Sequence, residues 1–187
     1  GILNGEELRS MSTVSRSKKR LSWLSVSILL NICAASIIAM FEDTLTSVIA
    51  LAVFLPIVSD MSGCSGNQSI AESMREITLG IARPSDMLRV WLKEISVGLI
   101  NGLALGLLLA TVTWLWKDNI YLGLVVGVAL ALNTMVAVSI GGVVPLLLKK
   151  LRVDPAVASG PILTTITDMC GFFLVLGLAT LMLHKLV

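Results

Sequence analysis

Charged side chains are scarce in this sequence. Only 14% of its 187 residues are Asp, Glu, Lys or Arg, whereas 56% are hydrophobic. A soluble domain of this size needs far more charged surface, so the composition excludes one and makes lipid the solvent for most of the chain. The formal net charge of +2 says little, because in a membrane protein the placement of charge matters more than its sum.

Residue types that bind metals tightly or act as nucleophiles are also few. The single histidine, His184, has no partner motif, and the three cysteines lie in apolar stretches without metal-ligand spacing. We interpret Cys33, Cys64 and Cys170 as small packing residues and expect no disulfide. No histidine-bearing zinc motif and no nucleophile paired with a base is found, so we expect no enzymatic activity. A cleavable signal peptide is not expected either, because the first apolar run is full length and no small-residue cleavage site follows it.

Long apolar runs, by contrast, are abundant. A helix crosses a bilayer with about 20 residues at about 1.5 Å each. Runs of sufficient length cover approximately residues 21–41, 45–77, 91–116, 121–148 and 154–183. The second run contains a polar, glycine-bearing segment from Asp60 to Ser69, which is tolerated at membrane depth only against protein or a water-filled cavity. We therefore predict an all-α integral membrane protein with five transmembrane helices.

Basic residues predict the orientation of these helices. With five spans, 12 of the 14 Lys and Arg residues fall on the side of the N-terminus, and only Lys117 and Lys185 fall on the other. Cytoplasmic segments carry the excess of basic residues in membrane proteins. The expected location is therefore the cell (inner) membrane, with the N-terminus in the cytoplasm and the C-terminus outside.

Asp168 is the strongest candidate for a functional residue. It lies in the middle of the fifth predicted span, which contains no Lys or Arg. A carboxylate near the bilayer centre costs at least about 2.5 kcal/mol and is usually functional. A cation or a shared proton would compensate for this cost. The structural alternative is a protonated Asp168 that makes interhelical hydrogen bonds.

The residues around Asp168 predict an oxygen-rich environment. Pro161 has no N–H, so the carbonyl of Val157 loses its helical partner, and Gly160 lets another helix approach. Together with the hydroxyls of Thr164 and Thr165, such a carbonyl suits a hard cation. We therefore predict that these residues line a pore.

Other acidic residues lie at the predicted membrane surfaces. Asp154 precedes Asp168 by fourteen residues, about 21 Å along a helix and about 40° from the same face, which places it at a cytoplasmic mouth. An N-terminal helix cap before Pro155 is the equally good alternative. Glu42 and Asp43 face outside, where they either attract cations to an outer mouth or form a solvated turn.

The polar segment of the second span has two interpretations. Its residues either line the pore or pack this helix tightly against its neighbours. They are Asp60, Gly63, Gly66, Asn67 and Gln68. Glu94 and Asn133, in the third and fourth spans, are interpreted as interhelical hydrogen-bonding residues.

Several of these motifs resemble one known family, the MgtE magnesium channels. The strongest match is Asp154-Pro155-Ala156 with Ser159-Gly160-Pro161, Thr164-Thr165 and Asp168. Weaker matches are Phe41-Glu42-Asp43, Leu55-Pro56, Glu94 with Gly98 and Gly102, and Asn133. The resemblance implies a homodimer in which the second and fifth helices of each protomer line the pore. It also implies that Asp168 holds a hydrated magnesium ion and that Asp154 lies at the cytoplasmic end.

The resemblance covers the membrane domain of that family, from about Arg20 to the C-terminus. The family's soluble sensor domains have no counterpart in this sequence, and residues 6–20 look like a remnant of the plug helix that joins those domains to the pore. We therefore expect a cytoplasmic segment at 1–20 and a pore domain at 21–187. One departure is found in the second helix, where Ser62 and Cys64 replace a glycine and an asparagine of the family pattern.

Together these features predict a magnesium-selective channel that conducts Mg²⁺ passively into the cytoplasm. The expected partners are a second copy of the chain, divalent cations and membrane lipid, with no nucleic acid. The alternative is a coupled secondary transporter, in which Asp168 alternates between a divalent cation and a proton or sodium ion.

Overall fold

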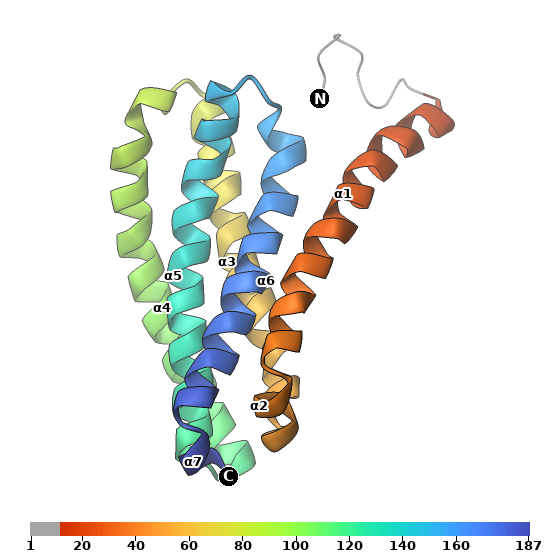
Figure 1. Cartoon of the computed structure of the whole chain (residues 1–187). Helices are drawn as coiled ribbons and strands as arrows, with labels where there is room; N and C mark the ends of the chain where they lie inside the picture. The colour runs from red at the N-terminus through yellow and green to blue at the C-terminus, as the bar shows by residue number, and fades with distance from the viewer. Residues whose placement is uncertain (1–11) are drawn as a thin grey trace.

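The computed structural model describes residues 12–187, apart from the side chains of Arg16, Lys19, Arg20, Trp23, Pro84 and Val157. The described residues form helices and no strand. The helices are α1 (Thr13–Met40), α2 (Glu42–Ser47), α3 (Leu51–Thr78), the 3₁₀ turn η1 (Pro84–Asp86), α4 (Met87–Lys117), α5 (Ile120–Lys150), α6 (Pro155–Leu181) and α7 (Leu183–Leu186). The long helices α1, α3, α4, α5 and α6 run alternately up and down, so that the start of α1 and the C-terminus lie at opposite ends (Figure 1).

Local sequence signals explain where the helices begin and turn. Asn119 caps α5, because its side-chain oxygen accepts hydrogen bonds of 3.0 Å from the N–H groups of Tyr121 and Leu122. Asp118 before it takes the left-handed conformation, with φ of 50°. These two residues make the turn between α4 and α5 very short. The two helices are therefore antiparallel neighbours.

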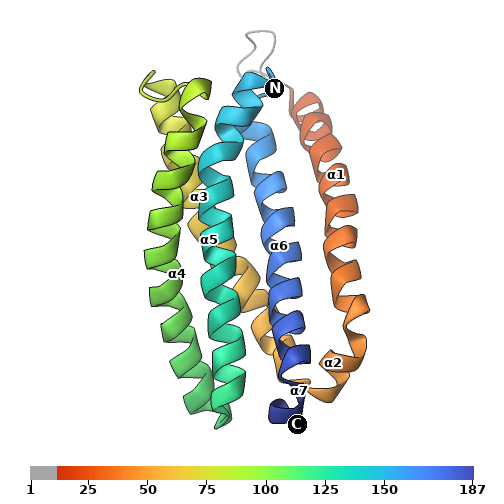
Figure 2. The ribbon, with the colours of Figure 1, turned by 60° about the vertical axis from the view of Figure 1, so that its left-hand side comes forward.

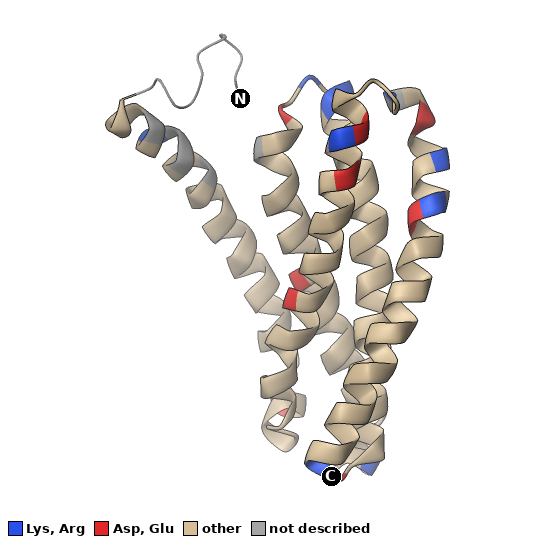
Figure 3. Cartoon of the chain, turned by 180° about the vertical axis from the view of Figure 1, so that it is seen from behind, with Lys and Arg blue, Asp and Glu red and all other residues tan. Residues whose placement is uncertain are grey.

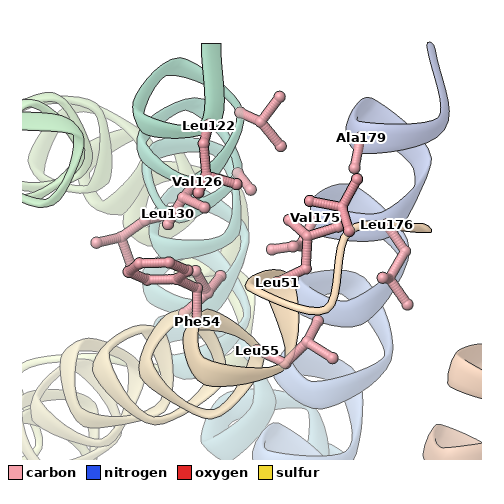
Figure 4. Packing of buried hydrophobic residues seen from close by; sticks show 13 residues of the cluster. Leu51, Phe54, Leu55, Leu122, Val126, Leu130, Val175, Leu176 and Ala179 are labelled. Carbon is pink, nitrogen blue, oxygen red and sulfur yellow. The ribbon is translucent and has the colours of Figure 1, made fainter. Parts of the chain in front are cut away.

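Helix α5 occupies the centre of the bundle and packs against α3, α4 and α6. Helix α1 packs chiefly against α6 and leans away from the bundle toward its own N-terminal end (Figures 1 and 2). The largest apolar core joins α3, α5 and α6 at the end of the bundle where the C-terminus lies. Leu51 and Phe54 meet Val126 and Val175 there, all of them buried (Figure 4).

Small residues bring α4 and α5 into close contact. A Cβ on Gly106 would lie 2.5 Å from the carbonyl oxygen of Gly127 and 2.9 Å from the Cβ of Ala131. Only glycine fits at this position, as is common where membrane helices pack backbone to backbone. The pair α4–α5 is therefore fixed by shape as well as by its apolar surface.

Three helical segments are long and apolar enough to cross a membrane: Met87–Lys117, Ile120–Lys150 and Ala158–Leu181. The apolar part of α1, Leu24–Met40, is shorter, and α3 is interrupted by its polar segment. The chain is therefore a multi-pass membrane protein, and the prediction of an all-helical fold is confirmed. That α1 and α3 also cross the membrane stays a prediction.

The helix bounds differ from the predicted spans at two places. Helix α1 begins at Thr13, whereas the first span was predicted from residue 21, because basic residues end the membrane-embedded part of a helix and not the helix itself. The run predicted from residue 45 is divided into α2 and α3, with a break at Val48–Ala50. Residues 1–11, the first part of the predicted cytoplasmic segment, lie outside the described residues.

Candidate ion site

Asp168 lies halfway along α6 and is partly buried against α3. The hydroxyl of Ser59, a buried residue of α3, donates a hydrogen bond to Oδ1 of Asp168. Residues 109 positions apart in the sequence thus meet across the interface of the two helices. One oxygen of the carboxylate is thus held by α3, and the described residues make no hydrogen bond to the other.

The α3–α6 cavity adjoins this pair and has a volume of about 330 Å³. Its lining residues come from α3 and α6 alone. They are Pro56, Ser59, Asp60, Gly63, Cys64, Asn67, Thr164, Thr167, Asp168 and Phe172. Two carboxylates, three hydroxyls and one amide therefore border a space that no Lys or Arg of the described chain lines. Such a space attracts cations and offers them oxygen ligands.

Helix α5 holds the backbone beside Asp168 in place. Nδ2 of Asn133, which is fully buried, donates a hydrogen bond of 3.0 Å to the carbonyl of Thr167. Asn133 can approach α6 because Gly171 has no side chain, since a Cβ there would lie 2.8 Å from Nδ2. The position of the carboxylate is thus fixed from α3 through Ser59 and from α5 through Asn133.

Charged residues of the described chain are unevenly distributed along the bundle. Figure 3 shows basic residues gathered toward the two ends of the bundle, with a wide band between them that contains a few acidic residues only. Most basic residues lie at the end where α3 and α5 finish, among them Arg75, Lys149 and Lys150. Lys117 and Lys185 lie at the other end, against the rings of Trp116 and Tyr121.

The α3–α6 cavity brings together about half of the predicted pore residues. Asp60, Gly63, Asn67, Thr164 and Asp168 line it. The side chain of Val157 lies outside the described residues. Of the polar segment, Gly66 is buried against Leu163 and the carbonyl of Ala137, as its packing interpretation expects, and Gln68 is exposed beyond the cavity.

The remaining predicted pore residues lie on α6 outside the cavity. Gly160 and Pro161 are partly buried, about two turns before Asp168. Thr165 is buried, and its hydroxyl donates to the carbonyl of Pro161 at 2.8 Å. This hydroxyl is therefore engaged in its own helix.

Acidic residues lie at both ends of the bundle. Asp154 caps α6, because its Oδ1 accepts a hydrogen bond of 3.0 Å from the N–H of Ala156. This is the alternative that the sequence left open. Glu42 and Asp43 are exposed in the first turn of α2, at the end of the bundle opposite Asp154.

Glu94 makes an interhelical contact in the cytoplasmic half of the predicted orientation. Its side chain is buried, and its Oε2 accepts a hydrogen bond of 2.7 Å from the hydroxyl of Ser69. Ser69 also donates to the carbonyl of Val138 at 2.9 Å. One serine thus joins α3 to α4 and α5.

Sequence reasoning missed several residues of the site. Ser59 is the most important, and Thr167, Pro56 and Phe172 also line the cavity. A signal was available for Ser59, because it directly precedes Asp60, the first residue of the polar segment. Its contact with Asp168 depends on the rotation of α3 against α6, which composition does not provide.

Comparison with known proteins identifies the family. The MgtE family, described as a divalent cation transporter family, matches residues 55–178. This region includes all the residues that line the cavity and makes up about two thirds of the chain. The chain belongs to the MgtE family.

Three curated relatives of the MgtE family align with most of the chain. The magnesium transporter MgtE of Bacillus subtilis is 36% identical over 90% of this chain. That of Enterococcus faecalis is 33% identical over 95%, and that of Thermus thermophilus is 38% identical over 88%. The alignments cover 37%, 39% and 36% of these MgtE proteins, so the chain spans less than two fifths of their length.

Proposed function

We propose that this chain forms the membrane-embedded pore of a magnesium channel, with Asp168 at its ion site and a second copy completing the pore. The α3–α6 cavity carries this proposal, because it places a partly buried carboxylate among oxygen ligands at the middle of a membrane-spanning helix. The relatives that are named magnesium transporters support the choice of ion.

The need for a second copy follows from what the cavity leaves uncovered. Asp60, Cys64 and Asn67 line it and are exposed on the single bundle. A charged side chain facing lipid near the bilayer centre costs about 2.5 kcal/mol or more, and polar segments are tolerated there only against protein or water. A two-fold related copy would cover the same face with the same residues and enclose a polar path between two Asp168 carboxylates.

Magnesium fits such a path better than most ions. It sheds its water reluctantly and binds through one or two carboxylates while keeping several waters. A cavity of about 330 Å³ in each protomer has room for an ion with part of its hydration shell. An inside-negative potential then drives entry, because each charge gains about 2.3 kcal/mol per 100 mV.

The orientation of the pore is part of the proposal. We place the basic end of the bundle, with Arg75 and Lys149, in the cytoplasm, because basic residues accumulate on that side. Residues 13–20 then form the cytoplasmic end of α1, and 21–187 form the pore domain with α1 and α3 as additional spans. The exposed acids Glu42 and Asp43 lie at the outer entrance, where they raise the local cation concentration.

Dye-reported magnesium influx into proteoliposomes under an imposed potential tests the proposal. We expect fast influx without a counter-ion gradient for the wild type, and none for Asp168→Asn, which keeps the volume and removes the charge. An Asp168→Asn variant that conducts like the wild type would show that the ion site is elsewhere. A requirement for a proton or sodium gradient would replace the channel by a coupled transporter.

A further inference from the structure

Ser59 is the residue that determines how Asp168 is presented to a cation. Its side chain is 8% exposed, it lines the α3–α6 cavity, and its hydroxyl donates to Oδ1 of Asp168. In the described chain this is the hydrogen bond that the carboxylate receives. Because Oδ1 accepts the hydrogen bond of Ser59, Oδ2 is the more available oxygen for an ion or for its water shell.

The surroundings prevent this arrangement from relaxing easily. Asn133 holds the carbonyl of Thr167, the residue before Asp168, from the side of α5. Gly171 of α6 lies close to both Asn133 and Ser59. A Cβ on Gly171 would be 2.8 Å from Nδ2 of Asn133 and 3.7 Å from Cα of Ser59. The serine and the carboxylate are therefore carried on backbones that pack closely at this level.

The number of available carboxylate oxygens distinguishes the two abundant divalent cations. Calcium takes six to eight oxygen ligands at about 2.3–2.6 Å and readily binds a carboxylate through both oxygens. Magnesium requires near-octahedral geometry, keeps several waters, and uses carboxylates through single oxygens. A carboxylate with one oxygen held by a serine hydroxyl is less suited to bind calcium through both oxygens, whereas it still offers the single oxygen that magnesium uses.

We propose that Ser59 is a positioning residue that sets the ion preference of the pore, by limiting Asp168 to coordination through one oxygen. This inference rests on the proposed function, because it assumes that the ion passes Asp168. The serine acts on the ion through the carboxylate. Its hydroxyl oxygen also keeps lone pairs that accept a hydrogen bond from a water of the ion's shell.

The experiment compares calcium and magnesium influx in the same proteoliposomes, with a dye for each ion. Ser59→Ala frees Oδ1, so we expect the calcium-to-magnesium influx ratio to rise by about tenfold, the scale set by the loss of one hydrogen bond to a charged group. Ser59→Thr keeps the hydroxyl and should keep the wild-type ratio. Ser62→Ala is the matched control, because Ser62 is buried on the same helix and its hydroxyl bonds to the carbonyl of Val58 instead.

The outcomes separate this inference from the proposed function. If Ser59→Ala lowers both influxes equally and leaves the ratio unchanged while Asp168→Asn abolishes them, Ser59 is only structural and the inference is wrong. If Asp168→Asn conducts normally, the ion site of the proposed function is wrong, and the inference about Ser59 is wrong with it. Should Ser59→Ala not fold, Ser59→Cys replaces the hydroxyl by a thiol, which is only a weak donor, and it must shift the ratio in the same direction for the inference to hold.

Discussion

The contact between Gly171 and Asn133 predicts that Gly171→Ala destabilises the protein and that Asn133→Ala relieves part of this loss. In Gly171→Ala the new Cβ would lie 2.8 Å from Nδ2 of Asn133, whereas ordinary contacts of a Cβ begin at 3.4 Å. The amide must therefore move. Because Asn133 is fully buried, it can do so only by giving up its hydrogen bond to the carbonyl of Thr167.

The magnitude follows from the groups involved. An interhelical hydrogen bond in a membrane protein contributes about 0.6–1.7 kcal/mol, and a buried amide left without a partner adds about 1–3 kcal/mol. Alanine instead of glycine within α6 returns up to about 1 kcal/mol through helix propensity. We expect Gly171→Ala to lower the free energy of unfolding by about 1–3 kcal/mol.

A double-mutant cycle tests whether the two residues are energetically coupled. Asn133→Ala alone loses the same hydrogen bond and leaves a void beside Gly171. In the double variant the methyl group introduced by Gly171→Ala enters that void, so the double variant should be about 1–2 kcal/mol more stable than the sum of the two single changes predicts. Gly177→Ala on the same helix is the control, because a Cβ there meets nothing within 4 Å.

The assay is unfolding of the purified protein in mixed micelles, followed by tryptophan fluorescence. Magnesium influx of each variant is measured in parallel, because a displaced α6 would also displace Asp168. Additive effects, or a Gly171→Ala variant as stable as the wild type, would refute the reasoning. Either result would mean that the amide has room to move, and that Asn133 does not fix the backbone beside the site.

Three further predictions follow from other positions. Gly106→Ala should destabilise the protein by about 1–2 kcal/mol, because its Cβ would lie 2.5 Å from a carbonyl of α5, while Ala104→Leu on the exposed face of α4 should be neutral in the same unfolding assay. A cationic thiol reagent should block magnesium influx in a variant whose sole cysteine is Cys64, which lines the cavity, and should not block one that retains only the exposed Cys33. Asp154→Asn should keep both stability and influx, because asparagine caps a helix as well as aspartate; a large loss of influx with intact stability would show instead that the charge itself is needed at the mouth.

The sequence is informative wherever the solvent imposes the pattern. Lipid requires long apolar segments, and a carboxylate within one is costly, so hydropathy and charge alone are enough to predict Asp168 as a candidate site residue. The all-helical fold follows for the same reason, because a membrane leaves no backbone group without an internal partner. The division of α2 from α3 was missed, since no proline or glycine marks the break at residues 48–50.

Rotation of one helix against another is what the sequence does not provide. Gly63 lines the cavity, whereas Gly66, one turn later, is buried against α5 and α6. Residues three positions apart differ by about 60° around a helix, which is enough to separate a cavity face from a packing face. The same rotation brings Ser59 to Asp168, and only the packed helices show it.

This rotation also explains the two departures from the family pattern in α3. Ser62 is buried, donates to the carbonyl of Val58 at 2.8 Å, and faces the hydroxyl of Thr134 at 3.5 Å, so it belongs to the packing of α3 against α5. Cys64 is exposed and lines the cavity, so it replaces an amide by a thiol beside the proposed ion path. A thiol is a poor ligand for magnesium, which prefers oxygen. We therefore expect the first departure to affect stability and the second to affect the proposed conduction, with Asp168, Asp60 and Asn67 as the main oxygen ligands of the cavity.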